Sequence, residues 1–299
     1  VLPDGSRNAI RIQRLKAKLG NHANASSEIE YDDADAWLVG EPGRGVRAII
    51  EMVARTRLDC VLGSTAGMRQ SVAEALWHTR HRSAFGAHLV DQPAMAGVLA
   101  DLALEAEAAT VTAIRLARAH DEDADAATVA FRRLATAVGK YWICKRGPQH
   151  AYEAMECLGG NGYTEAFPLA RRYREQPLLA IWEGSGNVIA LDVLRAMTRE
   201  PDTVEAFLAE VRRAAGADRL LDAHLARTVT VLTELARLAA DDPGAAAARA
   251  RHAVEALALA LQGSLLVRHT PAEVADAFLA ARLGVRGQCY GDLPPGMPL

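Results

Sequence analysis

The pattern of hydrophobic and polar positions changes near residue 41. Before it, polar and apolar residues alternate in Ile10-Arg11-Ile12 and Glu28-Ile29-Glu30-Tyr31, and Ala36-Trp37-Leu38-Val39 is a short apolar run. Alternation and short apolar runs between Gly, Asn and Asp predict β-strands. Three short strands bury too little surface to be stable alone. We therefore expect residues 1–41 to belong to a sheet whose other strands lie outside this chain.

From Glu41 onward the apolar positions follow helical spacing. Apolar residues recur at i, i+3, i+4 and i+7 in one face, formed by Val46, Ile49, Ile50 and Val53. This spacing predicts a helix that extends to about His81. Three more helices are expected at residues 91–120, 126–158 and 188–197. Asp91 is placed to cap the first of these, with Pro93 in its first turn. Four helices joined by short loops predict an antiparallel bundle.

The composition changes again after Pro201, where the sequence is rich in Ala, Leu and Arg and has no Lys. Apolar positions with helical spacing indicate two further helices, separated by Asp241-Asp242-Pro243-Gly244. Residues 201–284 thus predict a second helical module, followed by a Pro/Gly-rich tail. The expected fold class is mainly α. Its predicted parts are a β-strand remnant at 1–41, a four-helix bundle at 42–200, and a helical module with a tail at 201–299.

Charge and cysteine content exclude several kinds of partner. The 299 residues carry 34 Lys+Arg and 37 Asp+Glu, a net charge of −3, which gives no general attraction to nucleic acid or an anionic membrane. The four cysteines have no metal-ligand spacing, which is typical of a reducing compartment and predicts no metal site. No apolar run reaches the ~20 residues of a membrane span, and the first residues, Val1-Leu2-Pro3-Asp4-Gly5, have neither an initiator Met nor a signal pattern. We expect a cytoplasmic protein without membrane contact. We also expect the first residues of this chain to come from the middle of a longer protein.

Two glycine-rich turns bracket one carboxylate. They are Leu158-Gly159-Gly160-Asn161-Gly162-Tyr163 and Trp182-Glu183-Gly184-Ser185-Gly186-Asn187. Glycine lets the backbone approach a ligand closely, and a glutamate backed by Trp182 and Ile181 is a candidate general base if it is partly desolvated. From these residues alone, two helix-capping loops around a solvated Glu are an equally good interpretation.

Together with Arg82-Ser83-Ala84-Phe85-Gly86 and Gln92, these turns resemble the motifs of the acyl-CoA dehydrogenases, in order and spacing. Trp182 before the glutamate, Ser185-Gly186-Asn187 after it, the stretch Thr56–Cys60 and the extra helical module resemble the AidB-like branch. The resemblance covers nearly the whole chain but only the C-terminal half or so of such a protein. In these terms residues 1–41 are a remnant of the family's middle β-domain, and 42–200 its C-terminal four-helix bundle.

The resemblance implies FAD chemistry on an acyl-CoA substrate. Glu183 matches the catalytic base, which removes the α-proton of the thioester while the flavin accepts the β-hydride. In the family, the flavin ribityl hydroxyl and the backbone N–H of the base, here Glu183, polarise the thioester carbonyl. Arg82 matches a residue that reaches the FAD pyrophosphate of a neighbouring subunit, so the resemblance also implies a homotetramer.

Further positions match in the same way. The resemblance assigns cofactor contacts to Arg82, Phe85, Gln92, Gly159, Gly160, Ser185 and Asn187, and substrate contacts to Arg57, Gly184 and Arg195. Each has a purely structural alternative, which the sequence leaves open. Arg82 fits a helix-end surface residue, Phe85 a core residue, the glycine pair a helix C-cap, and the two arginines ordinary ion pairs.

Three departures from the family pattern concern the substrate. Glu156 stands where a Gln that contacts FAD is usual, Ala54 replaces a common Asp, and Trp182 replaces a Tyr. The bulkier Trp182 ring narrows the expected acyl pocket, and the three departures together suggest short or branched acyl groups, or weak dehydrogenase activity. The electron acceptor stays open, with electron-transfer flavoprotein as one candidate.

Two other functions are weighed against the dehydrogenase. The AidB-like resemblance suggests a DNA-binding flavoprotein, but residues 201–299 hold 10 Arg and no Lys against 12 Asp+Glu, a net charge of 10 − 12 = −2. Phosphate binding needs clustered positive charge, so DNA binding is disfavoured. The other alternative is a helical interaction module without catalysis, which a flavin absorption band after purification would distinguish.

Overall fold

Residues 10–31 form a two-stranded antiparallel hairpin in the computed structural model. Strand β1 (Ile10–Leu15) pairs with β2 (Ser27–Tyr31), with Ile10 opposite Tyr31 and Leu15 opposite Ser27. Every residue of β1 is exposed, as expected for strands without a core of their own. The expected third strand at 36–39 is wrong, because this run has no strand partner in the described residues and its apolar side chains are exposed.

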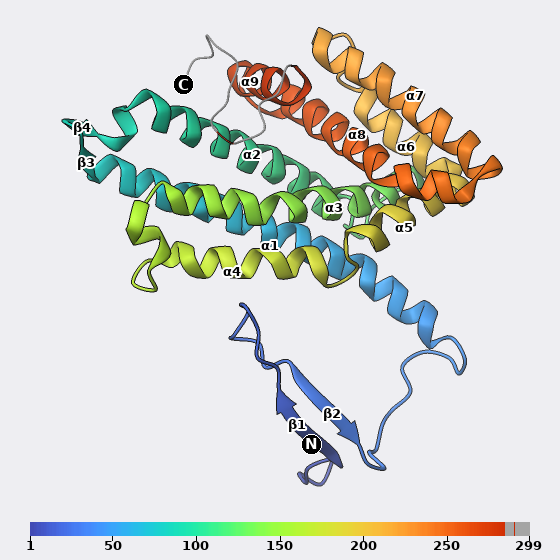
Figure 1. The fold of residues 1–299 in the computed structure, drawn as a ribbon. Coiled ribbons are helices and arrows are strands. Elements are labelled where there is room, and N and C mark those ends of the chain that lie inside the picture. Colours follow the sequence, from blue (N-terminus) through green and yellow to red (C-terminus); the bar gives the residue numbers. More distant parts are fainter. Residues whose placement is uncertain (285–289, 291–299) are drawn as a thin grey trace. The chain divides into compact units, whose positions relative to one another are not determined.

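The structure describes residues 1–284 and Tyr290. The chain divides into two compact units, Val1–Val53 and Ala54–Leu299, and each is described by itself. The helices shown in Figure 1 are α1 (Gly45–His81), α2 (Pro93–Arg118), α3 (Ala126–Glu156), α4 (Pro168–Ile181), α5 (Gly186–Arg199), α6 (Pro201–Arg212), α7 (Arg219–Asp241), α8 (Pro243–His269) and α9 (Ala272–Leu283). A small hairpin of β3 (Ser83–Ala84) and β4 (Ala87–His88) follows α1, and 3₁₀ turns η1 (Leu89–Asp91) and η2 (Gly159–Tyr163) precede α2 and α4.

Helix α3 is the centre of the bundle, and it packs against α2, α4, α5, α6 and α8. It continues through Pro148, and its buried side chains include Phe131, Leu134, Val138 and Ile143. Asp125 caps its first turn by accepting a hydrogen bond from the Thr128 N–H at 2.8 Å. The expected cap of α2 is wrong: Asp91 lies in η1, and Gln92 is the N-cap residue, because Pro93 occupies the first helical position.

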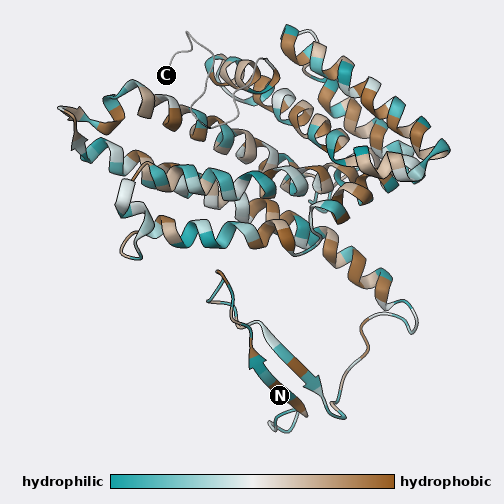
Figure 2. Cartoon of the chain, in the orientation of Figure 1, coloured by the Kyte–Doolittle hydropathy of each residue, from teal (hydrophilic) through white to brown (hydrophobic). Residues whose placement is uncertain are grey.

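The first turns of α1 follow the expected helical face, but this face is exposed. Val46, Ile49 and Ile50 are all more than half exposed, and Figure 2 shows the hydrophobic residues along these turns. The helix itself spans Gly45–His81, which confirms the prediction from spacing.

The helix expected at 188–197 is confirmed as α5, but a further helix precedes it. Helix α4, which precedes the Glu183 turn, was not expected, because its charged run Arg171–Glu175 and its internal Pro177 hide the helical pattern. The segment expected at 188–197 is α5, a separate helix of 14 residues. The Glu183 turn therefore joins two helices that both pack on α3.

A buried glutamine fixes α4 against α1 and α3. Gln176 donates to the Ser64 carbonyl at 3.2 Å and accepts from the Ser64 hydroxyl at 2.8 Å. A Cβ atom on Gly67 or Gly147 would lie within 2.3 Å of the Gln176 side-chain amide, so a larger residue at either position would displace this amide from Ser64. The junction thus holds the helix that leads into the Glu183 turn.

Helices α6 to α9 pack directly on the bundle, as the expected second helical module. Glu210 of α6 accepts hydrogen bonds from Arg115 of α2 at 3.0 Å and from Arg268 of α8 at 2.7 Å. The Trp142 indole N–H of α3 donates to Gln262 of α8 at 3.0 Å. Helix α8 is enclosed by its neighbours over most of its length, from Ala253 to Leu266.

One segment, Pro168–Arg199, is apolar enough by length and composition to be considered for a membrane span. The Glu183 turn divides it into α4 and α5, which have 14 residues each. Neither helix reaches the ~20 residues that a bilayer core requires.

Candidate functional site

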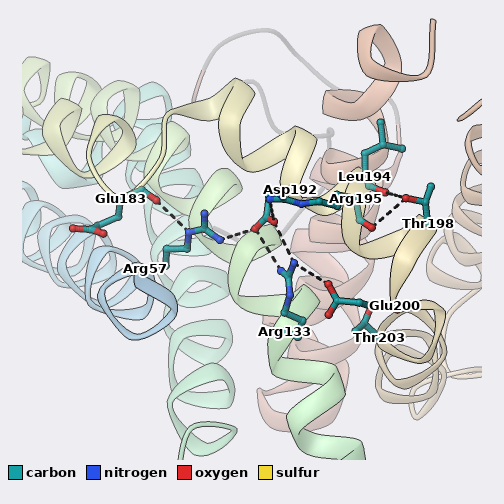
Figure 3. A network of polar contacts seen from close by, with 9 residues as sticks. All are labelled: Arg57, Arg133, Glu183, Asp192, Leu194, Arg195, Thr198, Glu200 and Thr203. Carbon is teal, nitrogen blue, oxygen red and sulfur yellow. Dashed lines mark hydrogen bonds and ion pairs between the residues drawn. The ribbon is translucent and has the colours of Figure 1, made fainter. Parts of the chain in front are cut away.

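Glu183 lies at the turn between α4 and α5, in an uncommon backbone conformation. Its φ of 56° is in the left-handed region, where a residue other than glycine costs roughly 1–3 kcal/mol and persists only if its surroundings hold it. The side chain is partly exposed, and Figure 3 shows its carboxylate pointing away from the arginine cluster around Asp192. Strain of this kind at a carboxylate marks the turn as a candidate site.

Two cationic side chains hold the backbone of this turn. The Glu183 carbonyl accepts a hydrogen bond from Arg57 Nε at 3.1 Å, and the Gly184 carbonyl accepts one from Lys140 Nζ at 2.5 Å. Gly184 has a φ of 109°, and a Cβ there would lie 2.9 Å from Ile189 Cδ1. Both the backbone conformation and the space therefore require glycine after Glu183.

Arg57 is anchored in turn by Asp192 of α5 (Figure 3). The buried Asp192 carboxylate accepts hydrogen bonds from Arg57 at 2.6 Å, Arg195 at 2.7 Å and Arg133 at 3.2 Å. Arg133 also reaches Glu200 at 3.2 Å. Burial raises the pKa of Asp192, but hydrogen bonds from Arg195 and Arg57 and the charge of Arg133 outweigh it and lower the pKa to about 2.

The depressed pKa gives an expected pH dependence of stability. An unfolded Asp titrates near ~3.9, so the stabilisation from Asp192 is present above about pH 4 and is lost as the pH falls toward 2. Replacing Asp192 by Asn should lower the free energy of unfolding by roughly 2 kcal/mol or more at pH 7. Urea unfolding at a series of pH values should show this difference shrinking between about pH 4 and 2. An equal difference at both ends of the range would contradict the assignment.

Two of the remaining predicted residues near Glu183 have structural partners of their own, and a third does not. Arg195 is bound to Asp192, as the ion-pair alternative expects. Asn187 Oδ1 accepts a hydrogen bond from Arg251 of α8 at 2.8 Å. Ser185 is the N-cap residue of α5, but its side chain makes no capping hydrogen bond. Its hydroxyl is therefore not committed to the helix start.

A second set of predicted residues lies at the other end of the bundle (Figure 1). Phe85 is at the tip of the β3–β4 hairpin, 98% exposed and with a φ of 52°, so the core-packing alternative is wrong for this residue. Gln92 donates to the Ala84 carbonyl at 2.9 Å and braces the hairpin, and Arg82 is exposed beside it. Gly159, with a φ of 57°, and Gly160 are exposed, with no atoms within 4 Å of a Cβ added to either.

The two sets are far apart within one chain. Arg57 lies in α1, and Arg82 directly follows the last residue of that helix, His81. The 25 residue steps between the two arginines therefore span about 37 Å at 1.5 Å per residue. The structure thus brings together Arg57, Glu183, Gly184, Ser185, Asn187 and Arg195, and it places Arg82, Phe85, Gln92, Gly159 and Gly160 elsewhere. One small ligand cannot contact both sets of a single chain.

Apolar side chains around the Glu183 turn are exposed. They are Ile181, Trp182, Val188 and Leu191. Glu183 itself is partly buried, between the exposed Trp182 side chain and the chain that follows. A patch of this kind indicates a surface that a ligand or another protein segment covers.

Sequence reasoning missed Lys140, Asp192 and Arg133. A signal existed for two of them. Asp192 stands on the apolar face of α5 between Ile189 and Val193, and Lys140 stands among the apolar residues of α3. A charged residue on a buried helix face is rare unless it is paired or holds a backbone group.

Comparisons with known proteins agree on one family. The family model described as acyl-CoA dehydrogenase, C-terminal domain, matches residues 43–198. Putative acyl-CoA dehydrogenase AidB of Escherichia coli K12 is 42% identical over 286 residues, which cover 96% of this chain and 51% of that protein. Acyl-CoA dehydrogenase family member 11 of Caenorhabditis elegans is 29% identical over 283 residues, which cover 89% of this chain and 45% of that protein.

Solved structures show the same similarity. Caenorhabditis elegans ACDH-11 in complex with C11-CoA superimposes with a TM-score of 0.83 at 27% identity, over 94% of this chain and 51% of that one. An acyl-CoA dehydrogenase from Bacillus anthracis complexed with FAD has the same fold, with a TM-score of 0.69 at 17% identity. The match covers 91% of this chain and 50% of that one. The chain spans about half the length of the relatives that it matches.

Proposed function

This chain belongs to the acyl-CoA dehydrogenase family, and we propose that the protein containing it is an FAD-dependent acyl-CoA dehydrogenase with Glu183 as its base. The observation that carries the proposal is the Glu183 turn. A glutamate in a strained conformation, with its carbonyl held by Arg57 and the next carbonyl held by Lys140, stands at the position that matches the family's catalytic glutamate.

The residues around the turn suit proton abstraction. Asp192 compensates the charge of Arg57 through a 2.6 Å ion pair, so Arg57 faces the turn as a donor to the Glu183 carbonyl. Within the described residues the Glu183 carboxylate forms no ion pair, which leaves it available as a base. The exposed Trp182 and Val188 side chains offer apolar contacts to an acyl chain, and covering them excludes water, which strengthens a carboxylate base.

FAD fits the two sets of predicted residues. Arg82 is an exposed guanidinium suited to a phosphate, Phe85 is an aromatic ring with almost no contacts of its own, and the Gly159–Gly160 backbone is open to close approach. Ser185 lies at the N-terminus of α5, whose dipole favours an anion. When bound, FAD accepts the β-hydride, while the Glu183 carboxylate accepts the α-proton, so that a Cα–Cβ double bond forms.

The separation of the two sets supports a site shared between copies. Because Arg82 lies about 37 Å from Arg57 along α1, the Arg82 set of one copy would complete a site at the Glu183 turn of another. We propose a homotetramer in the cytoplasm, acting on short or branched acyl-CoA in fatty acid metabolism, with electron-transfer flavoprotein as a candidate acceptor.

The experiment that tests this function is an assay of the full-length protein with a panel of acyl-CoA thioesters, starting with isovaleryl-CoA, and a dye as electron acceptor. We expect a flavin absorption band in the purified protein and dye reduction that depends on the thioester. The alternative of a helical module without catalysis predicts neither. Absence of turnover on every thioester of the panel would contradict the proposal.

DNA binding receives no support from the charges of the C-terminal helices. Arg213 and Arg268 are paired with Glu210, and Arg282 is paired with Asp101 and Glu105. These three arginines are engaged by carboxylates within the protein, which makes them less available to a phosphate backbone. A gel-shift titration of the full-length protein at low salt should show no retardation, and salt-dependent retardation would favour the DNA-binding alternative.

A further inference from the structure

Lys140 is a buried lysine whose ammonium group reaches the catalytic turn. It lies in the middle of α3 and is 1% exposed, so protein encloses its entire side chain. Burial lowers its pKa from the ordinary value. An ammonium group removed from water destabilises a protein unless the surroundings satisfy it, so a lysine here calls for a specific reason.

The partner of the Lys140 ammonium in the described residues is a backbone carbonyl. Nζ donates to the Gly184 oxygen at 2.5 Å, and this oxygen belongs to the peptide group directly after Gly184. A charged donor forms a stronger hydrogen bond than a neutral one. Lys140 therefore fixes the orientation of the Gly184–Ser185 peptide group.

Arg57 does the same for the preceding peptide group. Its Nε donates to the Glu183 carbonyl at 3.1 Å, from α1, whereas Lys140 donates from α3. Because each peptide group is planar, fixing two successive carbonyls fixes the backbone angles of Gly184, which lies between them. The peptide group that directly follows Glu183 is thus held by cations on two different helices.

We propose that Lys140 is a positioning residue for Glu183: together with Arg57 it holds Gly184 at its φ of 109° and so fixes the peptide group that directly follows the base. This inference rests on the proposed function, because the orientation of Glu183 matters for turnover only if Glu183 is the base. Lys140 forms its hydrogen bond with the Gly184 carbonyl and not with the Glu183 carboxylate, so its positioning effect passes through the backbone of the turn.

The test is Lys140→Met in the full-length protein. Methionine keeps an unbranched chain of similar length and removes the charge and the donor. We expect kcat to fall by about 10- to 100-fold with KM changed by less than about threefold, since a misplaced catalytic group costs this much. The melting temperature should stay the same or rise, because a buried charge is lost. Amide hydrogen exchange at Gly184–Gly186 should become faster. Lys140→Gln, which keeps a neutral N–H donor, should recover part of kcat.

The matched control is Cys144→Ala, one helical turn along α3, which alters packing without touching the turn carbonyls. It should leave kcat and exchange at Gly184–Gly186 unchanged. A Lys140→Met protein that melts at a lower temperature but keeps wild-type kcat and exchange would overturn the inference.

Glu183→Gln is measured in parallel to separate the two proposals. If Glu183→Gln loses turnover while Lys140→Met keeps it, the role of Lys140 is wrong and the proposed function stands. If Glu183→Gln turns over like the wild type, the proposed function is wrong, and the inference falls with it.

Discussion

Replacing Glu183 by Gln should reduce kcat of the full-length protein on its best acyl-CoA by about 10³-fold, within the range of general-base catalysis. Glutamine has nearly the same shape but cannot accept the α-proton. The protein should keep its fold and flavin, because the contacts that hold the turn go to the backbone carbonyls of Glu183 and Gly184 rather than to the carboxylate. Steady-state dye reduction gives kcat, and the visible spectrum gives the flavin content.

Two matched variants sharpen this result. Glu165→Gln changes an exposed glutamate that pairs with Arg174 before α4, and it should leave kcat unchanged. Glu183→Asp keeps a base but shortens it, so its kcat should lie between those of the wild type and Glu183→Gln. A Glu183→Gln protein with kcat within about twofold of the wild type would remove general-base catalysis from this residue.

Replacing Glu105 by Gln should lower the free energy of unfolding by about 3–5 kcal/mol, the usual effect of breaking a buried ion pair. Glu105 of α2 is 2% exposed and accepts hydrogen bonds from Arg146 of α3 at 2.8 and 3.0 Å and from Arg282 of α9 at 3.0 Å. Burial raises the pKa of this carboxyl, but the charges of Arg146 and Arg282 outweigh it and lower the pKa to about 2. The neutral amide leaves the Arg146 guanidinium buried without a carboxylate.

The measurement is urea unfolding and the melting temperature of the full-length protein. Glu107→Gln is the control, since Glu107 is two residues along α2 and only partly buried. It should change the free energy of unfolding by less than about 0.5 kcal/mol. A loss below about 1 kcal/mol for Glu105→Gln would show that the ion pairs of Glu105 with Arg146 and Arg282 contribute no more than exposed ones.

The helices could be predicted where apolar spacing is regular. The face that begins at Val46 placed α1 correctly, and the Gly/Pro breaks separated α7 from α8. Helix α4 could not be found in this way, because what holds it is the polar Gln176–Ser64 junction, which involves residues 112 positions apart. The apolar run at 36–39 predicted a strand that does not form, since apolar residues alone do not make a strand without a partner.

The candidate site is likewise predictable only in part. The motif around Glu183 could be recognised in the sequence because its residues are contiguous. Lys140 and Asp192 act on that turn from other helices, and only their unusual place on apolar faces could have signalled them. The distance between the Arg82 and Glu183 sets also needs the fold, because it depends on α1 being one unbroken helix.

The central claim, that Glu183 removes the α-proton, is tested most directly by isotope exchange. An acyl-CoA with sulfur in place of its β-carbon has no β-hydride to lose, so exchange of its α-protons in D₂O reports proton abstraction alone. The full-length protein should incorporate deuterium at the α-carbon, measured by mass spectrometry, and Glu183→Gln should incorporate it no faster than the solution without protein. Equal incorporation by the two proteins would contradict the claim.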